Sequence, residues 1–123
     1  MEQYPEKELT EKIIGCAFDI FNELGYGLPE RMYQKAMTYA LEKNNLVYSR
    51  ECYGKIEYDD KVIGKYFLDF LVEGRVAVEF KVRNDIYDVD VAQLLHYLKM
   101  KKIKVGLILA ITSGGVKIKR LII

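Results

Sequence analysis

The first part of the chain carries apolar residues at helical spacing. They recur every three or four positions and predict a helix over Leu9–Leu24, with Thr10 as its N-cap and Gly25 as its end. Proline suits the first position of a helix, so a second helix is predicted from Pro29 to about Lys43. Asn44–Asn45 then breaks the helical pattern.

After Leu46 the apolar residues alternate with polar ones, as they do in half-buried strands. The predicted strands are Val47–Tyr53, Lys55–Tyr58 and Val62–Phe67, followed by the strands around Asp69 and Glu79. A turn is predicted at Asp59–Asp60.

The last part of the chain returns to one helix and two strands. A helix capped by Asp88 or Asp90 should run to Met100, and its core face consists of Val91, Leu94, Leu95 and Leu98. Val105–Thr112 and Val116–Ile122 predict a hairpin. The order α-α-β-β-β-β-α-β-β predicts one α/β domain over residues 1–123, with a mixed β-sheet flanked by helices.

Composition supports a globular domain. Half of the 123 residues are hydrophobic and 30% are charged. No apolar run approaches the about 20 residues of a membrane span, and the N-terminus lacks the order of a signal peptide. We therefore expect a cytoplasmic protein with no membrane partner, in which Cys16 and Cys52 are packed, reduced thiols.

The candidate chemistry lies in two neighbouring strands. Asp69 stands alone in an apolar run, and a buried carboxylate is costly unless a cation or several donors meet it. The strand period of two places Glu79 and Lys81 on one face. If Glu73–Arg75 forms a three-residue loop, the register brings Asp69 opposite Glu79 on that same face.

This cluster has two interpretations from the residues alone. Carboxylate oxygens bind Mg²⁺, whose coordination is completed by water and substrate phosphate, and Lys81 can then orient the attacking water. Alternatively, Glu79 and Lys81 form a solvated strand face while Asp69 pairs with a nearby Arg or Lys.

The spacing of Asp69, Glu79 and Lys81 across a hairpin resembles the signature of the PD-(D/E)XK nuclease superfamily. Further segments resemble its GxxExxY branch and the QxxxY helix of RecB-like exonucleases. These segments are Gly27–Tyr33, Leu9–Ala17 with Asn22–Gly25, and Ala92–Lys99.

The resemblance implies a restriction-endonuclease-like core and a metal-dependent nuclease that hydrolyses DNA. Mg²⁺, for which Mn²⁺ can substitute, would be held by Asp69, Glu79 and the Phe80 carbonyl. Glu30 would be an outer ligand, although its position alone fits a favourable interaction with the helix dipole. Lys81 would serve the attacking water.

The resemblance also implies roles for two residues on the third predicted helix. Gln93 and Tyr97 lie four residues apart, so one helix can aim both at the site to hold a phosphate, a base or the lysine.

Three positions depart from the family pattern, namely Phe67 in place of a basic residue, Asp90–Val91 in place of His-Glu, and Ala110 in place of an asparagine. A catalytically idle module that binds nucleic acid or a protein is the alternative function.

Charge gives little support to a nucleic-acid partner, because the net charge is only +1. Two clusters of basic residues fit either a solvated surface or phosphate contacts. The first cluster is Lys99, Lys101, Lys102 and Lys104, and the second is Lys117, Lys119 and Arg120. The single histidine, His96, is expected to be exposed.

A small catalytic domain has little surface with which to grip a duplex, so we expect a homodimer. Its candidate interface residues are Tyr48, Tyr53, Tyr58 or the final Leu121–Ile123, for which core packing is an equal alternative.

Overall fold

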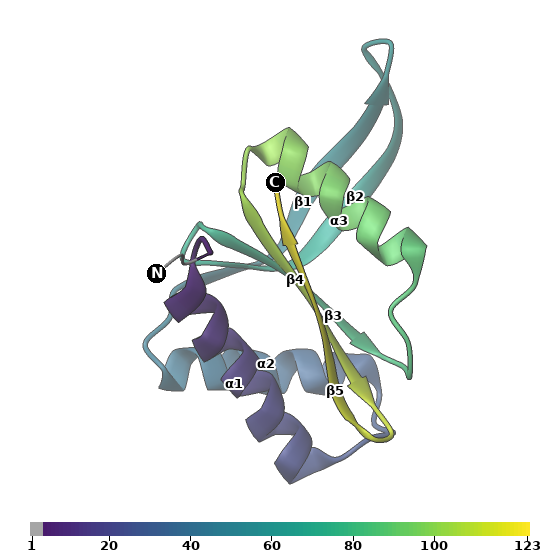
Figure 1. The fold of residues 1–123 in the computed structure, drawn as a ribbon. Helices are drawn as coiled ribbons and strands as arrows, with labels where there is room; N and C mark the ends of the chain where they lie inside the picture. The colour runs from purple at the N-terminus through teal and green to yellow at the C-terminus, as the bar shows by residue number, and fades with distance from the viewer. Residues whose placement is uncertain (1–3) are drawn as a thin grey trace.

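A computed structural model describes residues 4–123 as a mixed five-stranded sheet with three helices (Figure 1). The elements are α1 (Lys7–Leu24), α2 (Glu30–Lys43), β1 (Tyr48–Tyr58), β2 (Lys61–Val72), β3 (Val76–Val82), α3 (Asp88–Lys101), β4 (Val105–Thr112) and β5 (Gly115–Ile122). Within residues 4–123 the strand order is β1-β2-β3-β4-β5, in which β3 and β4 are the parallel pair and the other neighbours are antiparallel. α3 supplies the crossover that a parallel pair requires.

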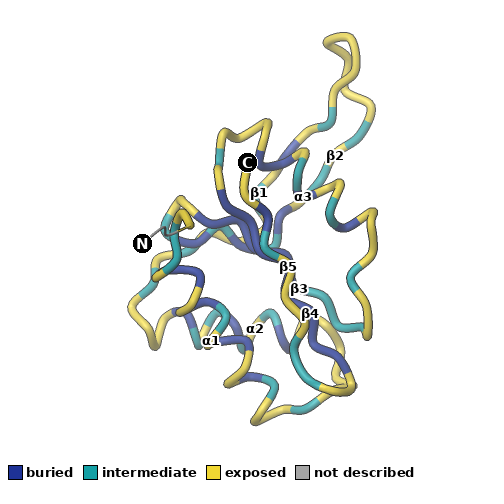
Figure 2. The backbone as a smooth tube through the Cα atoms, in the orientation of Figure 1, coloured by how far each residue is buried: buried dark blue, intermediate teal, exposed yellow. Residues whose placement is uncertain are grey.

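The sheet is covered on both faces. Alternate residues of β3 and β4, such as Val78 and Leu107, pack with α1 and α2 in the larger core. The intervening residues, such as Ala77 and Ile108, pack against α3 in a smaller core. The central strands are therefore apolar on both faces, and Figure 2 shows the buried residues concentrated there.

The predicted fold class is confirmed, and the sequence of helical and strand regions agrees with the prediction. The number of strands before α3 differs, because the predicted order has four strands there, drawn from five predicted segments, whereas the structure has three. Val47–Tyr53 and Lys55–Tyr58 join in β1, while Val62–Phe67 and the segment around Asp69 join in β2.

Gly54 explains why β1 continues where a break was predicted. A Cβ at this position would lie 3.1 Å from the Tyr97 ring and 2.9 Å from Met100 Cε of α3. The glycine thus allows α3 to approach the strand closely, which is a regular use of glycine within a sheet.

Two predicted helix caps differ from the structure. α1 begins one turn earlier than Thr10, at Lys7, and the Thr10 side chain is buried with its hydroxyl donating to the Lys7 carbonyl. At α3 the N-cap residue is Tyr87, whose backbone N–H donates to the Asp90 carboxylate at 2.9 Å. Asp90 thus closes the helix end from inside its first turn.

The β1–β2 hairpin extends beyond the rest of the sheet (Figure 1). Tyr53, Tyr58 and Phe67 are exposed on it, whereas Tyr48 is half-buried. Leu121 is buried, so of the last three residues only the final two isoleucines are exposed.

Several remaining expectations are decided by burial. His96 is exposed as predicted, and both cysteines are free thiols, Cys16 buried and Cys52 half-buried. Within residues 4–123 there is no helix both long enough and apolar enough to cross a membrane.

We expect Gly106→Ala to lower the free energy of unfolding by about 1–3 kcal/mol, because a Cβ would overpack the smaller core. That atom would lie 2.9 Å from Leu94 Cδ2 and 3.1 Å from Leu98 Cδ1. Gly15→Ala in α1 is the control, since nothing lies within 4 Å of its Cβ, and it should stabilise by up to about 1 kcal/mol. Urea denaturation measures both, and equal effects would contradict the close packing of α3 on β4.

Candidate active site

The site forms where β2 and β3 separate. Their ladder ends at the pair Phe70 and Val78. Beyond it, the Asp69 N–H donates to Glu79 Oε1 at 3.1 Å, and the Phe80 N–H donates to Asp69 Oδ2 at 2.7 Å. Two side-chain carboxylates therefore accept backbone N–H groups that lie past the end of the ladder.

The alternation of β2 is interrupted at this point. Leu68 packs in the smaller core and Phe70 in the larger one, although they are two residues apart and would share a face of a regular strand. On the neighbouring strand, Glu51 has a left-handed backbone (φ 51°), and the β1–β2 register omits the pair Glu51 and Asp69. This irregularity directs the Asp69 carboxylate toward β3 and α2.

Burial and mutual repulsion make the carboxylates reluctant to ionise. Burial raises the pKa of Asp69 to about 6, and the negative charge of Glu30 adds to the rise while the Phe80 N–H opposes it. Burial likewise raises the pKa of Glu79 to about 7, with repulsion from Asp69 as the next cause. A bound cation would offset both the burial and the repulsion. Carboxylates with raised pKa values are typical of functional sites.

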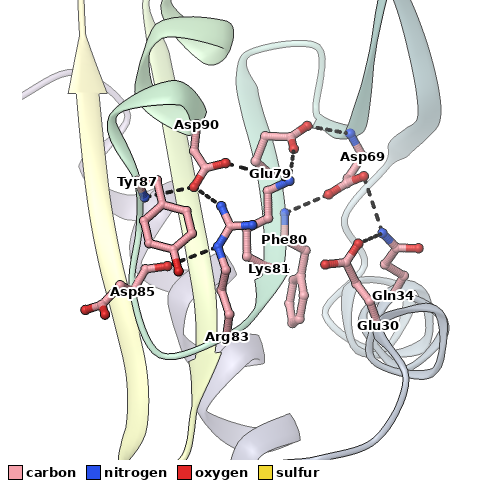
Figure 3. A network of polar contacts seen from close by, with 10 residues as sticks. All are labelled: Glu30, Gln34, Asp69, Glu79, Phe80, Lys81, Arg83, Asp85, Tyr87 and Asp90. Atoms are coloured by element: carbon pink, nitrogen blue, oxygen red, sulfur yellow. Dashed lines mark hydrogen bonds and ion pairs between the residues drawn. The ribbon is translucent and has the colours of Figure 1, made fainter.

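The first turn of α2 adds a third acid to this region. The Gln34 side-chain amide donates to Asp69 Oδ1 at 3.3 Å and to Glu30 Oε2 at 3.5 Å (Figure 3). Glu30 thus approaches from α2 as predicted and is connected to Asp69 through Gln34. Over residues 4–123, no three His, Cys, Asp or Glu side chains are close enough to hold one ion directly, so the outer-ligand role of Glu30 stays a prediction.

Lys81 lies between two acids. Its Nζ is 3.8 Å from Glu79 Oε2 and 3.9 Å from Asp90 Oδ1. Asp90 is buried and also accepts hydrogen bonds from Arg83 and from the Tyr87 N–H, as Figure 3 shows. Arg83 in turn lies over the Tyr87 ring, 4.4 Å from its centroid. The ammonium is therefore held near Glu79 by an anchored second carboxylate.

The sequence indicates Asp90 only as a helix cap and as a departure from the family pattern. Its position in the first turn of the helix that follows Lys81 was the available signal. The ion pair itself depends on how α3 packs, which local spacing does not determine.

Among the residues that the structure describes, neither Gln93 nor Tyr97 is hydrogen-bonded to the carboxylates. Gln93 is exposed, and its side chain takes part in none of the hydrogen bonds found within residues 4–123. Tyr97 is buried in the smaller core, where its ring centroid lies 5.9 Å from that of Tyr66. Their predicted contact with substrate stays a prediction without support from the geometry.

Tyr66 faces the site in place of Tyr97. Its hydroxyl is buried next to Glu79, and the pKa of Tyr66 is raised by burial and by that carboxylate. Within residues 4–123 this hydroxyl has no partner with the geometry of a hydrogen bond, although it lies close enough to the Glu79 carboxylate to interact with it. Sequence reasoning missed Tyr66 because its strand was predicted to end before Asp69.

The residues present fit a divalent cation. Asp69 and Glu79 offer hard oxygen ligands, and the unpartnered Tyr66 hydroxyl leaves a polar position beside them. The nearby ammonium of Lys81 is the main positive charge that faces the pair. The half-buried Asp69 and the buried Glu79 face one ammonium at close range, and this leaves an excess of negative charge that Mg²⁺ or Mn²⁺ would neutralise.

Comparison with known proteins identifies similar sequences and folds. A family model described as the PD-(D/E)XK nuclease superfamily matches residues 7–121. No curated protein matches the chain. The crystal structure of SSO0001 is similar with a TM-score of 0.58 and 20% sequence identity, over 95% of this chain and 58% of that protein. At this identity the likeness shows the fold alone.

We expect the ionised pair to cost stability when no metal is present. Both pKa values are raised on folding, so the folded state binds protons more tightly and its stability falls as the pH rises from about 4 to above 7. Relative to Asp69→Asn/Glu79→Gln, the parent should lose on the order of 2 kcal/mol over this range. Urea denaturation in a chelator measures the difference, and a parent that gains stability relative to the variant would contradict the shifts.

Proposed function

Because this chain belongs to the PD-(D/E)XK nuclease superfamily, we propose that it is a metal-dependent nuclease that hydrolyses DNA phosphodiester bonds. The observation that carries this proposal is the pair Asp69 and Glu79, cross-linked through two backbone amides with Lys81 beside it. Removing a carboxylate pair from water costs stability unless a cation or hydrogen-bond donors compensate the charges. The burial of this pair therefore favours a metal site over a solvated strand face.

We assign the chain to the GxxExxY branch, near the RecB-like exonucleases, and the structure of the motif supports this assignment. The Tyr33 hydroxyl donates to the Gly25 carbonyl at 2.6 Å and accepts from the Leu28 N–H at 3.3 Å. Tyr33 therefore fastens the loop that precedes α2, while Gly27 adopts a positive φ of 115° there. The motif thereby fixes the helix end that carries Glu30.

Each residue of the site has a role that its position allows. When bound, Mg²⁺ or Mn²⁺ polarises the phosphorus centre and activates a water nucleophile. Asp69, Glu79 and the Phe80 carbonyl would hold the ion, and Glu30 would approach it through water. The Lys81 ammonium would orient the attacking water and stabilise the negative charge that develops on the phosphate.

We propose that the functional unit is a homodimer that engages DNA. The exposed Tyr53 and Tyr58 on the β1–β2 hairpin support an interface there. Tyr53→Ser/Tyr58→Ser should then dissociate the dimer, because it removes apolar contact area. Light scattering at tens of micromolar, about the range where weak dimers separate, provides the measurement. A monomeric parent protein would contradict the proposal.

We expect Lys81→Ala to lower the rate of DNA cleavage by about 10²–10³-fold, since it removes one transition-state donor. Metal affinity should be retained, because the ammonium repels the cation and does not ligate it. Glu79→Gln should lose both cleavage and affinity. Cleavage assays with duplex, single-stranded and branched DNA, together with Mn²⁺ calorimetry, separate these effects.

Lys99→Ala is the matched control, since Lys99 is an exposed lysine of α3 with no ion pair among the described residues. It should leave the cleavage rate at saturating DNA unchanged. If the parent cuts none of the three DNA forms with either metal, the idle binding module becomes the better account.

A further inference from the structure

A second feature lies beside the carboxylate pair. α2 and β1 enclose a hollow of about 610 Å³, and three cations line it, Arg31, Lys35 and Arg50. Arg31 and Lys35 lie four residues apart and so occupy one face of α2. Glu51 is the one acid among the residues lining this hollow. The hollow therefore carries a net charge of about +2, which is unlike the chain as a whole at +1.

Among the residues that the structure describes, these three cations have no ion-pair partner. Within residues 4–123, ion pairs at up to 4.0 Å involve other basic side chains, such as Arg75 and Lys117, and none involves Arg31, Lys35 or Arg50. Unpaired cations gathered in a concave surface attract an anion, and phosphate is an anion whose geometry matches the arginine fork.

Arg50 is held in place. Its guanidinium lies over the Phe70 ring, 5.0 Å from the centroid, and one N–H group donates to Gln34 Oε1 at 3.4 Å. The two contacts restrain the guanidinium while leaving other N–H donors free.

Gln34 joins the hollow to the candidate metal site. Its carbonyl oxygen accepts from Arg50, and its amide nitrogen donates to Asp69 and Glu30. Arg50 also acts electrostatically on Asp69, whose pKa it helps to lower. The hollow and the carboxylate pair therefore lie next to each other, separated by one side chain.

We propose that this hollow is a phosphate-binding subsite, in which Arg31, Lys35 and Arg50 hold a backbone phosphate of the nucleic acid strand close to the phosphate that is cleaved. The inference rests on the proposed nuclease function. A nucleic acid strand bound at both the hollow and the carboxylate pair would lie along α2. The subsite would then determine which phosphodiester bond reaches the carboxylate pair. Gln34 is a positioning residue, because it orients both Arg50 and Asp69.

The test uses the full chain and labelled DNA, duplex and single-stranded, in the presence of a chelator. Fluorescence anisotropy over a range of salt concentrations gives the affinity and the slope of its logarithm against the logarithm of salt. Arg31→Gln/Lys35→Gln should make the duplex slope shallower by up to about 0.9, the value for one neutralised phosphate, because binding then releases fewer counterions. Lys35→Gln alone should produce part of that change.

Lys43→Gln is the matched control. Lys43 is an exposed lysine of the same helix that does not line the hollow and has no ion pair among residues 4–123. It should leave both affinity and slope unchanged. Arg50→Gln should weaken binding, while Arg50→Lys, which retains the charge but not the fork, should recover part of it. Thermal melting confirms that each variant is folded.

The outcomes separate the two proposals. Weaker binding and shallower slopes in the hollow variants support the subsite even if the parent cuts no DNA, and in that case the nuclease proposal fails alone. Cleavage by the parent together with unchanged slopes in these variants overturns the subsite and leaves the nuclease proposal standing. A parent that binds no DNA at low salt, or a control that weakens as much as Lys35→Gln, overturns the subsite as well.

Discussion

The site depends on two hydrogen bonds from backbone amides to the carboxylates of the half-buried Asp69 and the buried Glu79. A carboxylate taken out of water costs several kcal/mol unless donors or a cation compensate it. Here the Phe80 N–H donates to Asp69 and the Asp69 N–H donates to Glu79, at 2.7 and 3.1 Å. These bonds cross-link the strands where their regular ladder has ended, and they bring the two acids together before any metal arrives. The compensation is partial, and the raised pKa values show what is left for a cation to relieve.

Helices on both faces of the sheet contribute side chains next to this pair. α2 supplies Gln34 and Glu30 on one side, while α3 supplies Asp90, which holds Lys81 on the other. Acids thus outnumber bases next to the carboxylate pair, whereas the adjacent hollow has an excess of cations. This separation of charge suits a ligand that combines a divalent cation with a chain of phosphates, and it explains how a protein with a net charge of +1 can present a local anion site.

The sequence predicts the centre of the site better than its surroundings. Loop length and strand parity determine the register, so the contact of Asp69 with Glu79 could be derived from local spacing. The contributions of Tyr66, Asp90 and Gln34 could not, because they depend on the irregularity at Asp69 and on how α2 and α3 pack. Tyr97 illustrates the same limit. The rotation of α3 is set by its close approach to Gly54 and Gly106, which directs Tyr97 into the core.

The most direct test of a metal centre at this pair is anomalous diffraction from crystals of the parent protein soaked in Mn²⁺. We expect a peak between the Asp69 and Glu79 carboxylates, within about 2.0–2.2 Å of an oxygen of each, the range for a small octahedral cation. The peak should be absent from crystals of Glu79→Gln soaked in the same way. A peak bound elsewhere on the chain, or one that persists in Glu79→Gln, would contradict a metal site at these two carboxylates.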